Sequence, residues 1–217
     1  MCFELLNILV KNNQYKCNIY YQNEIIKSTG ACSKKIYLIK NGVMKIGCFT
    51  DHGEEVVLII LTKNQVFGAS SIFIDFCSYC MYESLSEETK VYEFDKNIIQ
   101  KTIKKNPNLY KDFLSILGKE YQEYENRIKT LQIQSAELRL IKVLFEFKEK
   151  FGCPYNSEKI IIDSPLNQNE LSNYIRVSRV TTNKIINKFN SNLLLEYSNK
   201  SIIIKKSFFD NYKQYDV

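Results

Sequence analysis

The chain has 217 residues, of which 45% are apolar, and a formal net charge of +6. A chain of this length can bury one large core or two modest ones, so we expect two small domains. No segment approaches the ~18 uncharged apolar residues of a membrane span. The first residues lack the basic flank and apolar region of a signal peptide. We therefore expect a chain that folds where it is made and has no membrane partner.

The seven cysteines lie mostly far apart, without the regular spacing of a secreted disulfide scaffold. This pattern favours thiols in a reducing compartment. Cys77 and Cys80 form a CxxC pair, which supplies two ligands where a structural zinc or cluster site needs about four. We expect no metal site and interpret the pair as ordinary thiols, with a metal or redox role as the open alternative.

Enzyme chemistry is not expected from this composition. The single histidine, His52, lies in a predicted turn without a nearby partner for nucleophilic catalysis. The chain has seven glycines and contains neither GxxxxGK nor GxSxG. We therefore predict that the protein is not an enzyme and requires no cofactor.

Short β-rich runs alternate with turn signals over residues 19–94 and predict an antiparallel β-roll or sandwich. Asn41-Gly42 lies between two such runs and predicts a two-residue hairpin, because both turn positions need a positive φ. Asp51-His52-Gly53 predicts the next turn.

After Pro107 the apolar spacing changes to alternating steps of four and three residues, which is the heptad pattern of a helix that contacts a partner helix. Three heptads make roughly 33 Å of helix. The alternative is a core helix of the same domain, which would favour a broader apolar stripe. We predict a homodimer through this seam, formed by Tyr110, Leu114, Leu117, Tyr121, Tyr124, Ile128 and Leu131.

A second helix is predicted over residues 136–151, where Gly152 and Pro154 end it. Residues 132–135 are the predicted hinge, and residues 159–163 form a short strand. The predicted domains are therefore a β-roll over 1–108, a dimerisation helix and hinge over 109–134, and a C-terminal domain over 135–217.

The segment LNQNELSNYIRVSRVTTNKIINKF (166–189) has the layout of a helix-turn-helix, with a first helix to Ile175 and a second from Arg179. Ser178 is a suitable N-cap for the second helix. The inner side of the two crossing helices is formed by Leu171, Ile175, Val177, Thr182 and Ile185. Two strands around residues 198–200 follow and predict a wing, with Lys205 and Lys206 near the DNA backbone.

The outer side of the second helix carries Arg179, Val180, Asn183 and Lys184. Arginine at the start of a helix can contact guanine O6 and N7 in the major groove, while Thr181 and Lys188 are better placed for phosphates. Residues 159–206 hold eight Lys or Arg against three acids, as a DNA-binding surface would. The predicted DNA contacts are Ser178, Arg179, Val180, Thr181, Asn183, Lys184, Lys188 and Lys200. The alternatives are a solvated helical hairpin and a winged helix that contacts protein.

The order of β-roll, long helix and winged helix resembles the cyclic-AMP receptor and fumarate-nitrate regulator superfamily. Within it, KNQVFGASSIF (63–73), KKNPNLY (104–110) and residues 151–186 resemble the global nitrogen regulators of cyanobacteria and their plastid-encoded red-algal homologues. The resemblance implies an α+β fold with a jelly-roll-like sensor, contact with RNA polymerase, and control of nitrogen-assimilation promoters. It also implies palindromic sites with GTA and TAC half-sites. The location would be the chloroplast stroma for a plastid gene, and otherwise the bacterial cytoplasm.

The resemblance further implies 2-oxoglutarate as effector, at a site formed by Phe67, Gly68, Ala69, Ser70, Tyr82 and Glu125. Cys80 and Glu120 stand where the family has two arginines, and losing two charge-assisted bonds of about 1.5–3 kcal/mol each should weaken dicarboxylate binding strongly. Either the effector differs or the pocket has become structural. The loop also lacks the glutamate and arginine of cyclic-nucleotide sensors, so cyclic AMP is not expected. In the turn before the second helix, Arg176 replaces the family's glycine, which predicts a locally adjusted turn.

Overall fold

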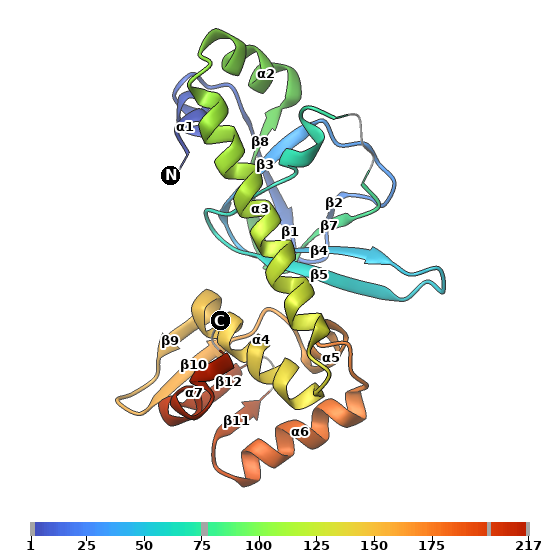
Figure 1. Cartoon of the computed structure of the whole chain (residues 1–217), viewed down its shortest axis with the longest axis vertical. Coiled ribbons are helices and arrows are strands. Elements are labelled where there is room, and N and C mark those ends of the chain that lie inside the picture. The colour runs from blue at the N-terminus through green and yellow to red at the C-terminus, as the bar shows by residue number, and fades with distance from the viewer. Residues whose placement is uncertain (1–2, 75–77, 199–200, 216–217) are drawn as a thin grey trace. The chain divides into compact units, whose positions relative to one another are not determined.

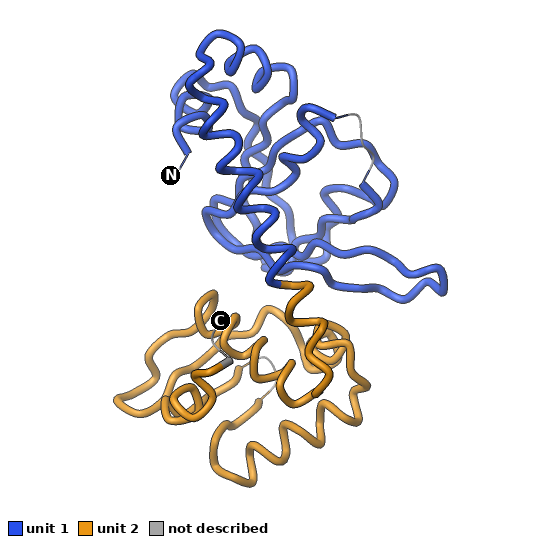
Figure 2. Tube along the Cα trace, in the orientation of Figure 1, with its two compact units in different colours: residues 1–126 blue, residues 127–217 orange. Residues whose placement is uncertain are grey.

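The computed structural model describes residues 3–74, 78–198 and 201–215. The chain divides into two compact units, residues 1–126 and 127–217 (Figure 2). The first unit contains two antiparallel sheets, and the second contains the helix-turn-helix and its own small sheet (Figure 1). The predicted α+β fold class, with a β-roll before a long helix and a winged helix-turn-helix, is confirmed.

The β-roll consists of two four-stranded antiparallel sheets. The strands of the first sheet are, in order across it, β1 (Lys16–Tyr21), β8 (Glu88–Asp95), β3 (Lys35–Asn41) and β6 (Val66–Phe67). Those of the second sheet are β2 (Ile25–Lys27), β7 (Met81–Ser84), β4 (Met44–Phe49) and β5 (Glu55–Leu61). Buried side chains from both sheets, among them Ile39 and Ile59, form one core cluster, so the sheets pack through the alternating apolar residues of their strands.

The predicted hairpin at Asn41-Gly42 is wrong. Strand β3 pairs with β6 and β8, whereas β4 pairs with β5 and β7, so the chain crosses between sheets here. Of the two turn residues, Gly42 alone has a positive φ, at 90°. A Cβ on Gly42 would lie 2.6 Å from Thr89 Oγ1. The glycine therefore permits a close crossing of two strands rather than a tight reversal. The turn at Asp51-His52-Gly53 is confirmed, as it joins the paired strands β4 and β5.

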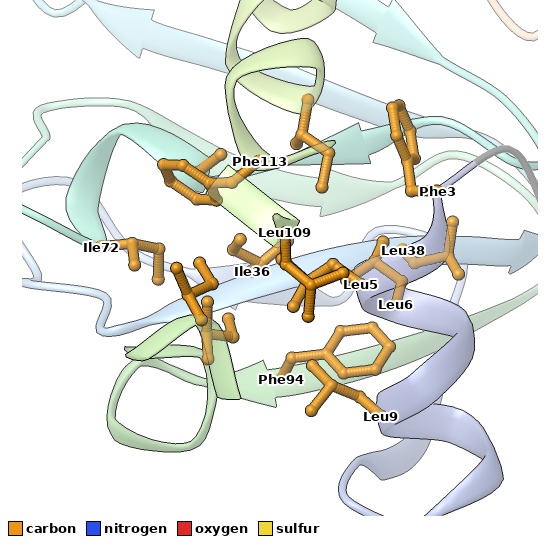
Figure 3. Close-up of a cluster of buried hydrophobic side chains, with 14 residues drawn as sticks. Phe3, Leu5, Leu6, Leu9, Ile36, Leu38, Ile72, Phe94, Leu109 and Phe113 are labelled. Atoms are coloured by element: carbon orange, nitrogen blue, oxygen red, sulfur yellow. The ribbon is translucent and has the colours of Figure 1, made fainter. Parts of the chain in front are cut away.

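Helices cover the outer face of the β3–β8 sheet. These are α1 (Glu4–Lys11), α2 (Lys96–Lys105) and the start of α3 (Leu109–Gln132). Figure 3 shows Leu5, Leu6 and Leu9 of α1 pointing toward Phe94 and Leu109, and all five side chains are fully or almost fully buried. Burying each leucine stabilises the fold by about 1.5–3 kcal/mol, so this cluster holds the beginning of α3 on the β-roll.

The second unit begins within α3 and continues through α4 (Ala136–Phe151), whose N-cap is Ser135. Its sheet has the order β11 (Leu195–Ser198), β12 (Ser201–Lys205), β10 (Lys159–Asp163) and β9 (Gly152–Pro154). The other helices of this unit are α5 (Gln168–Tyr174), α6 (Arg179–Ser191) and α7 (Lys206–Asn211). Short 3-10 turns lie at Ala69–Ser71 in the first unit and at Lys213–Tyr215 in the second. The adjacent strands β11 and β12 form the predicted wing.

The expectation that the cysteines are thiols is wrong for Cys32, which is disulfide-bonded. Sequence spacing did not indicate this, since folding can bring together cysteines that lie far apart along the chain. Cys17, Cys48, Cys80 and Cys153 are free thiols. Cys77, the other member of the CxxC pair, lies outside the described residues.

Candidate nucleic-acid interface and sensor loop

The first helix of the helix-turn-helix is fixed at both ends. Asn167 caps α5 by accepting bonds from Asn169 N and Glu170 N, while the Glu170 carboxylate accepts from Asn167 N at 2.7 Å. This reciprocal arrangement is a capping box. Leu171 and Ile175 are fully buried, as the sequence predicted for the inner side of the helix pair.

The turn between the helices keeps a left-handed residue. Arg176 has φ of 54°, so the predicted adjustment of the turn does not occur. A side chain costs roughly 1 kcal/mol in this region. The turn persists because Arg176 N donates to Asn173 O and Val177 N donates to Ser172 O, which hold the backbone in place.

The second helix, α6, presents one face inward and one outward. Ser178 is its N-cap, with Oγ accepting from Thr181 N at 3.2 Å. The inward face packs into the unit through Thr182, Ile185, Ile186 and Phe189, which are all buried. The predicted N-cap and the predicted inner positions on this helix are confirmed.

The outward face of α6 contains most of the predicted DNA contacts. Ser178, Arg179, Val180, Thr181 and Lys184 are exposed, and the apolar Val180 is 66% exposed. An exposed valine side chain does not pack in the core of its own unit, but it suits contact with a thymine methyl group. The structure thus brings these five side chains together on the first two turns of one helix.

Three predicted contacts differ from this group. Asn183 is half-buried and its Oδ1 is shielded from solvent, because its position borders the buried Ile186. Lys188 is exposed, but its Nζ lies 2.6 Å from Glu137 Oε2. This contact is an exposed surface ion pair, which water and salt screen, so a phosphate could displace it. Lys200, at the tip of the wing, lies outside the described residues.

Two arginines that the sequence analysis did not single out hold the turn from behind. The Arg127 guanidinium stacks on the Tyr174 ring at 3.9 Å and donates from Nη2 to Tyr174 O at 2.6 Å. Arg139 donates to Ile175 O at 2.8 Å and to Ile133 O at 2.6 Å. Cations favour the carbonyl end of a helix, and this pair caps α5 while linking the hinge to the helix-turn-helix. An arginine within the apolar run of α4 was the available sequence signal.

The predicted dimerisation seam on α3 is only partly free. Tyr110, Leu114, Tyr121 and Ile128 are exposed, at 44%, 63%, 69% and 58%. Leu117 and Tyr124 instead pack against the two core clusters of the β-roll, and Leu131 is half-buried. One edge of the heptad stripe therefore packs on the chain's own core, as the alternative interpretation expected, while dimerisation through the other edge stays a prediction. The other edge is an apolar row spaced by four and then seven residues.

The predicted effector loop is occupied by a side chain of the protein itself. Gly68 has φ of 83° and precedes the 3-10 turn Ala69–Ser71. Gly68 N and Ala69 N each donate to the Glu120 carboxylate at 3.0 Å. Phe67, Gly68 and Ala69 are buried and Ser70 is exposed. Glu120 was expected only to remove a cation from the effector site, and its binding to the loop was not predicted.

Aromatic rings fill the space beside this loop. Phe67 stacks on Tyr37 at 4.9 Å and meets Tyr82 edge-on at 4.9 Å. Burial raises the pKa of Tyr82 far above its usual value. Glu125 is half-buried on α3, and the carboxylate that accepts from Gly68 N and Ala69 N is that of Glu120. Phe67 and Tyr82 of the predicted effector site thus form a packed aromatic cluster with Tyr37.

No cluster of three or more metal-ligating side chains occurs in residues 3–74, 78–198 and 201–215. Within the same residues, every helix is too short or too polar to cross a membrane. These findings concern the described part of the chain.

Two family models match the chain. Residues 18–106 match the cyclic nucleotide-binding domain, and residues 138–207 match the Crp-like helix-turn-helix domain. The anaerobic regulatory protein of Bacillus subtilis is 21% identical over 95% of this chain and 85% of its own length. The global nitrogen regulator of a Nostoc species is 23% identical over 86% of this chain and 84% of its own length.

Solved structures show the same fold at low identity. FixK2 from Bradyrhizobium japonicum superposes with a TM-score of 0.78 at 14% identity, covering 94% of this chain and 98% of that one. The c-di-GMP responsive regulator CLP from Xanthomonas campestris gives a TM-score of 0.77 at 14% identity, covering 93% and 99%.

A β-roll followed by a long helix and a winged helix-turn-helix with an exposed recognition helix defines a DNA-binding transcription regulator with a sensor-type domain. The chain belongs to the cyclic-AMP receptor and fumarate-nitrate regulator superfamily.

Proposed function

We propose that the protein is a homodimer that binds a palindromic duplex through α6 and regulates nitrogen-assimilation genes. The observation that carries the DNA-binding part is the outward face of α6, where Arg179, Val180 and Lys184 stand exposed above a buried inner face. Relatives named global nitrogen regulator, such as that of Nostoc, support the choice of target genes. We place the protein in the chloroplast stroma if its gene is plastid-encoded, and otherwise in a bacterial cytoplasm, with RNA polymerase as a partner.

The roles of the side chains follow from their positions. Arg179 begins α6, where a guanidinium can contact guanine O6 and N7 together, and Val180 can meet a thymine methyl group. Lys184 lies four residues after Val180, just over one turn of the helix, and therefore on the same face. Thr181 and Lys188 contact phosphates, which position the helix without reading sequence. The wing consists of β11 and β12, and its second strand ends at Lys205, in the same unit as α6.

The second copy of the chain is proposed on the exposed row of α3. Tyr110, Leu114, Tyr121 and Ile128 recur at heptad-compatible spacing, and all are at least 44% exposed. An apolar row of this spacing fits the same row of another helix better than solvent. A two-fold dimer would present two α6 helices to half-sites about one DNA turn apart, which matches a palindromic operator.

The test is fluorescence anisotropy with a duplex containing GTA and TAC half-sites separated by about eight base pairs, and with a scrambled duplex. We expect Arg179→Ala to weaken binding to the palindrome by about 10-fold or more and to reduce the preference over the scrambled duplex. Lys104→Ala, on the exposed face of α2, changes the net charge equally and serves as the control. Equal effects of the two variants would contradict the assignment of α6 as the reading helix.

A free dicarboxylate effector such as 2-oxoglutarate is not favoured by the loop. Its amides already bond the Glu120 carboxylate, and Cys80 offers no cation. Among the structural neighbours, the CLP regulator is named as c-di-GMP responsive. We propose that no cofactor is required here.

A further inference from the structure

The loop that follows β6 is shaped as an anion-binding nest. Gly68 is left-handed, and the 3-10 turn behind it directs successive backbone N–H groups to one side. Such nests bind carboxylates and phosphates because several N–H dipoles converge on one charge. A Cβ at position 68 would lie 2.9 Å from Lys35 O, so glycine is needed at this point both for the conformation and for the space.

A carboxylate of the chain itself occupies the nest. Glu120 lies 52 residues further along, in the middle of α3, and its Oε1 and Oε2 accept from Gly68 N and Ala69 N at 3.0 Å each. The bonds engage both oxygens separately, as they would for a bound carboxylate ligand. Two successive backbone N–H groups therefore hold this carboxylate.

The surroundings act on the pKa of the Glu120 carboxyl group in two opposite directions. Burial raises the pKa of Glu120, and bonds from the amides of Gly68, Ala69 and Ser70 offset part of that rise. Burial raises the pKa of Tyr82 and of Tyr124, and the nearby Glu120 charge raises both further. Tyr124 also packs against the aromatic cluster of Phe67 and Tyr37.

We propose that Glu120 is a built-in ligand of the sensor domain, which occupies the anion-binding loop in cis and fastens α3 to residues 67–71 without any diffusible anion. The regulatory consequence rests on the proposed DNA-binding function: DNA affinity does not depend on a carboxylate or phosphate effector. The occupied loop itself can be tested without DNA.

The first experiment measures melting temperature by differential scanning fluorimetry on the full-length protein. Acetate, 2-oxoglutarate and cyclic AMP, each at millimolar concentration, should leave the wild-type Tm unchanged. Glu120→Ala should lower Tm by roughly 5 °C, because two charge-assisted bonds are lost. Acetate should then raise the Tm of this variant selectively, since the emptied nest can accept a free carboxylate.

The matched control is Glu123→Ala, on the same helix less than one turn away. Glu123 Oε1 accepts from the Gln65 side chain at 2.7 Å, whereas the Glu120 carboxylate accepts from the loop amides. Acetate should not raise the Tm of this control selectively. The proposal is overturned if acetate acts equally on both variants, or if the wild type is itself stabilised by 2-oxoglutarate.

A second measurement does not depend on how well the variant folds. In wild-type protein, the backbone amide proton signals of Gly68 and Ala69 should shift together with pH, following the ionisation of one carboxyl group. In Glu120→Gln, which retains a single acceptor oxygen, this shared titration should be absent. Independent titration of the two amides in the wild type would contradict the proposal.

The DNA arm separates the two ideas. If wild-type protein prefers the palindrome and 2-oxoglutarate leaves its affinity unchanged within about twofold, the built-in ligand is supported together with the proposed function. Tightening by about 10-fold or more would overturn the built-in ligand but not the DNA-binding assignment. Loss of all sequence preference would refute the proposed function, while the melting and amide titration results would still decide the role of Glu120.

Discussion

At the scale of single residues, the Glu120 carboxyl group has an unusual environment, since its bonds come from backbone amides rather than from a cation. Burial raises its pKa above the ordinary value. For an acid of this kind the folded state holds the proton more tightly than the unfolded state. The part of the stability that depends on protonation of Glu120 is therefore complete below the unfolded pKa and is lost as pH rises through the folded pKa.

We therefore predict a pH-dependent difference between wild type and Glu120→Gln. The free energy of unfolding of the wild type, relative to the variant, should fall as pH rises above about 4.5. Tyr82 and Tyr124 face the carboxyl group, and burial raises the pKa of both, so they stay protonated throughout. Urea titrations across this pH range measure the difference. A relative stability that rises with pH would show that the amide bonds outweigh burial.

Arg176 gives a second prediction at this scale. Its φ of 54° is less favourable for any residue with a Cβ than for glycine, and least favourable for a β-branched residue. Arg176→Gly should raise the free energy of unfolding by about 0.5 kcal/mol, while Arg176→Val should lower it by about 1 kcal/mol or more. Thermal unfolding of the two variants provides the check. A stabilising valine would show that the turn does adjust when the residue changes.

At the scale of elements, the exposed row of α3 is the feature that a second copy would cover. Leu114→Glu places a charge in the row, where the two copies of the new carboxylate would lie near each other, and should convert dimers to monomers at micromolar concentration. Ser115→Glu introduces the same charge at the next, exposed position and should leave the dimer intact. Sedimentation velocity distinguishes the two species. Equal behaviour of both variants would argue against this seam.

The helix-turn-helix depends on the arginine pair behind its turn. Replacing Arg139 by methionine removes donors from Ile175 O and Ile133 O, which should destabilise the second unit by roughly 2–4 kcal/mol. Hydrogen exchange at residues 171–178 should accelerate more than exchange in α7. Uniform acceleration across residues 127–215 would indicate general destabilisation instead of a local role in the turn.

The sequence could predict those features of the elements that depend on local patterns of residues. The cap at Ser178 and the buried positions of α6 follow from local spacing, and the sequence predicted both. The crossing at Gly42 was predicted wrongly as a hairpin, since the pairing of β3 and β4 with other strands is a long-range property. The bond from Glu120 to the loop spans more than fifty residues, so no local pattern could reveal it.

At the scale of the whole molecule, charge is concentrated where the DNA contacts are proposed. Residues 159–206 carry eight Lys or Arg against three acids. Neutralising phosphates releases counterions, so affinity should fall steeply with salt. Lys188→Ala should reduce the salt slope by about one and weaken binding to all duplexes alike. An unchanged slope would show that the ion pair with Glu137 persists in the complex.

We propose that two copies of the chain read two half-sites of one duplex through α6. The most direct test compares, by fluorescence anisotropy, a full palindrome with one whose half-sites are moved apart by about five base pairs, which turns them to opposite faces of the DNA. We predict that the moved half-sites bind at least about 10-fold more weakly, close to a single half-site. Equal affinity for the two duplexes would contradict the account of a two-fold dimeric DNA reader.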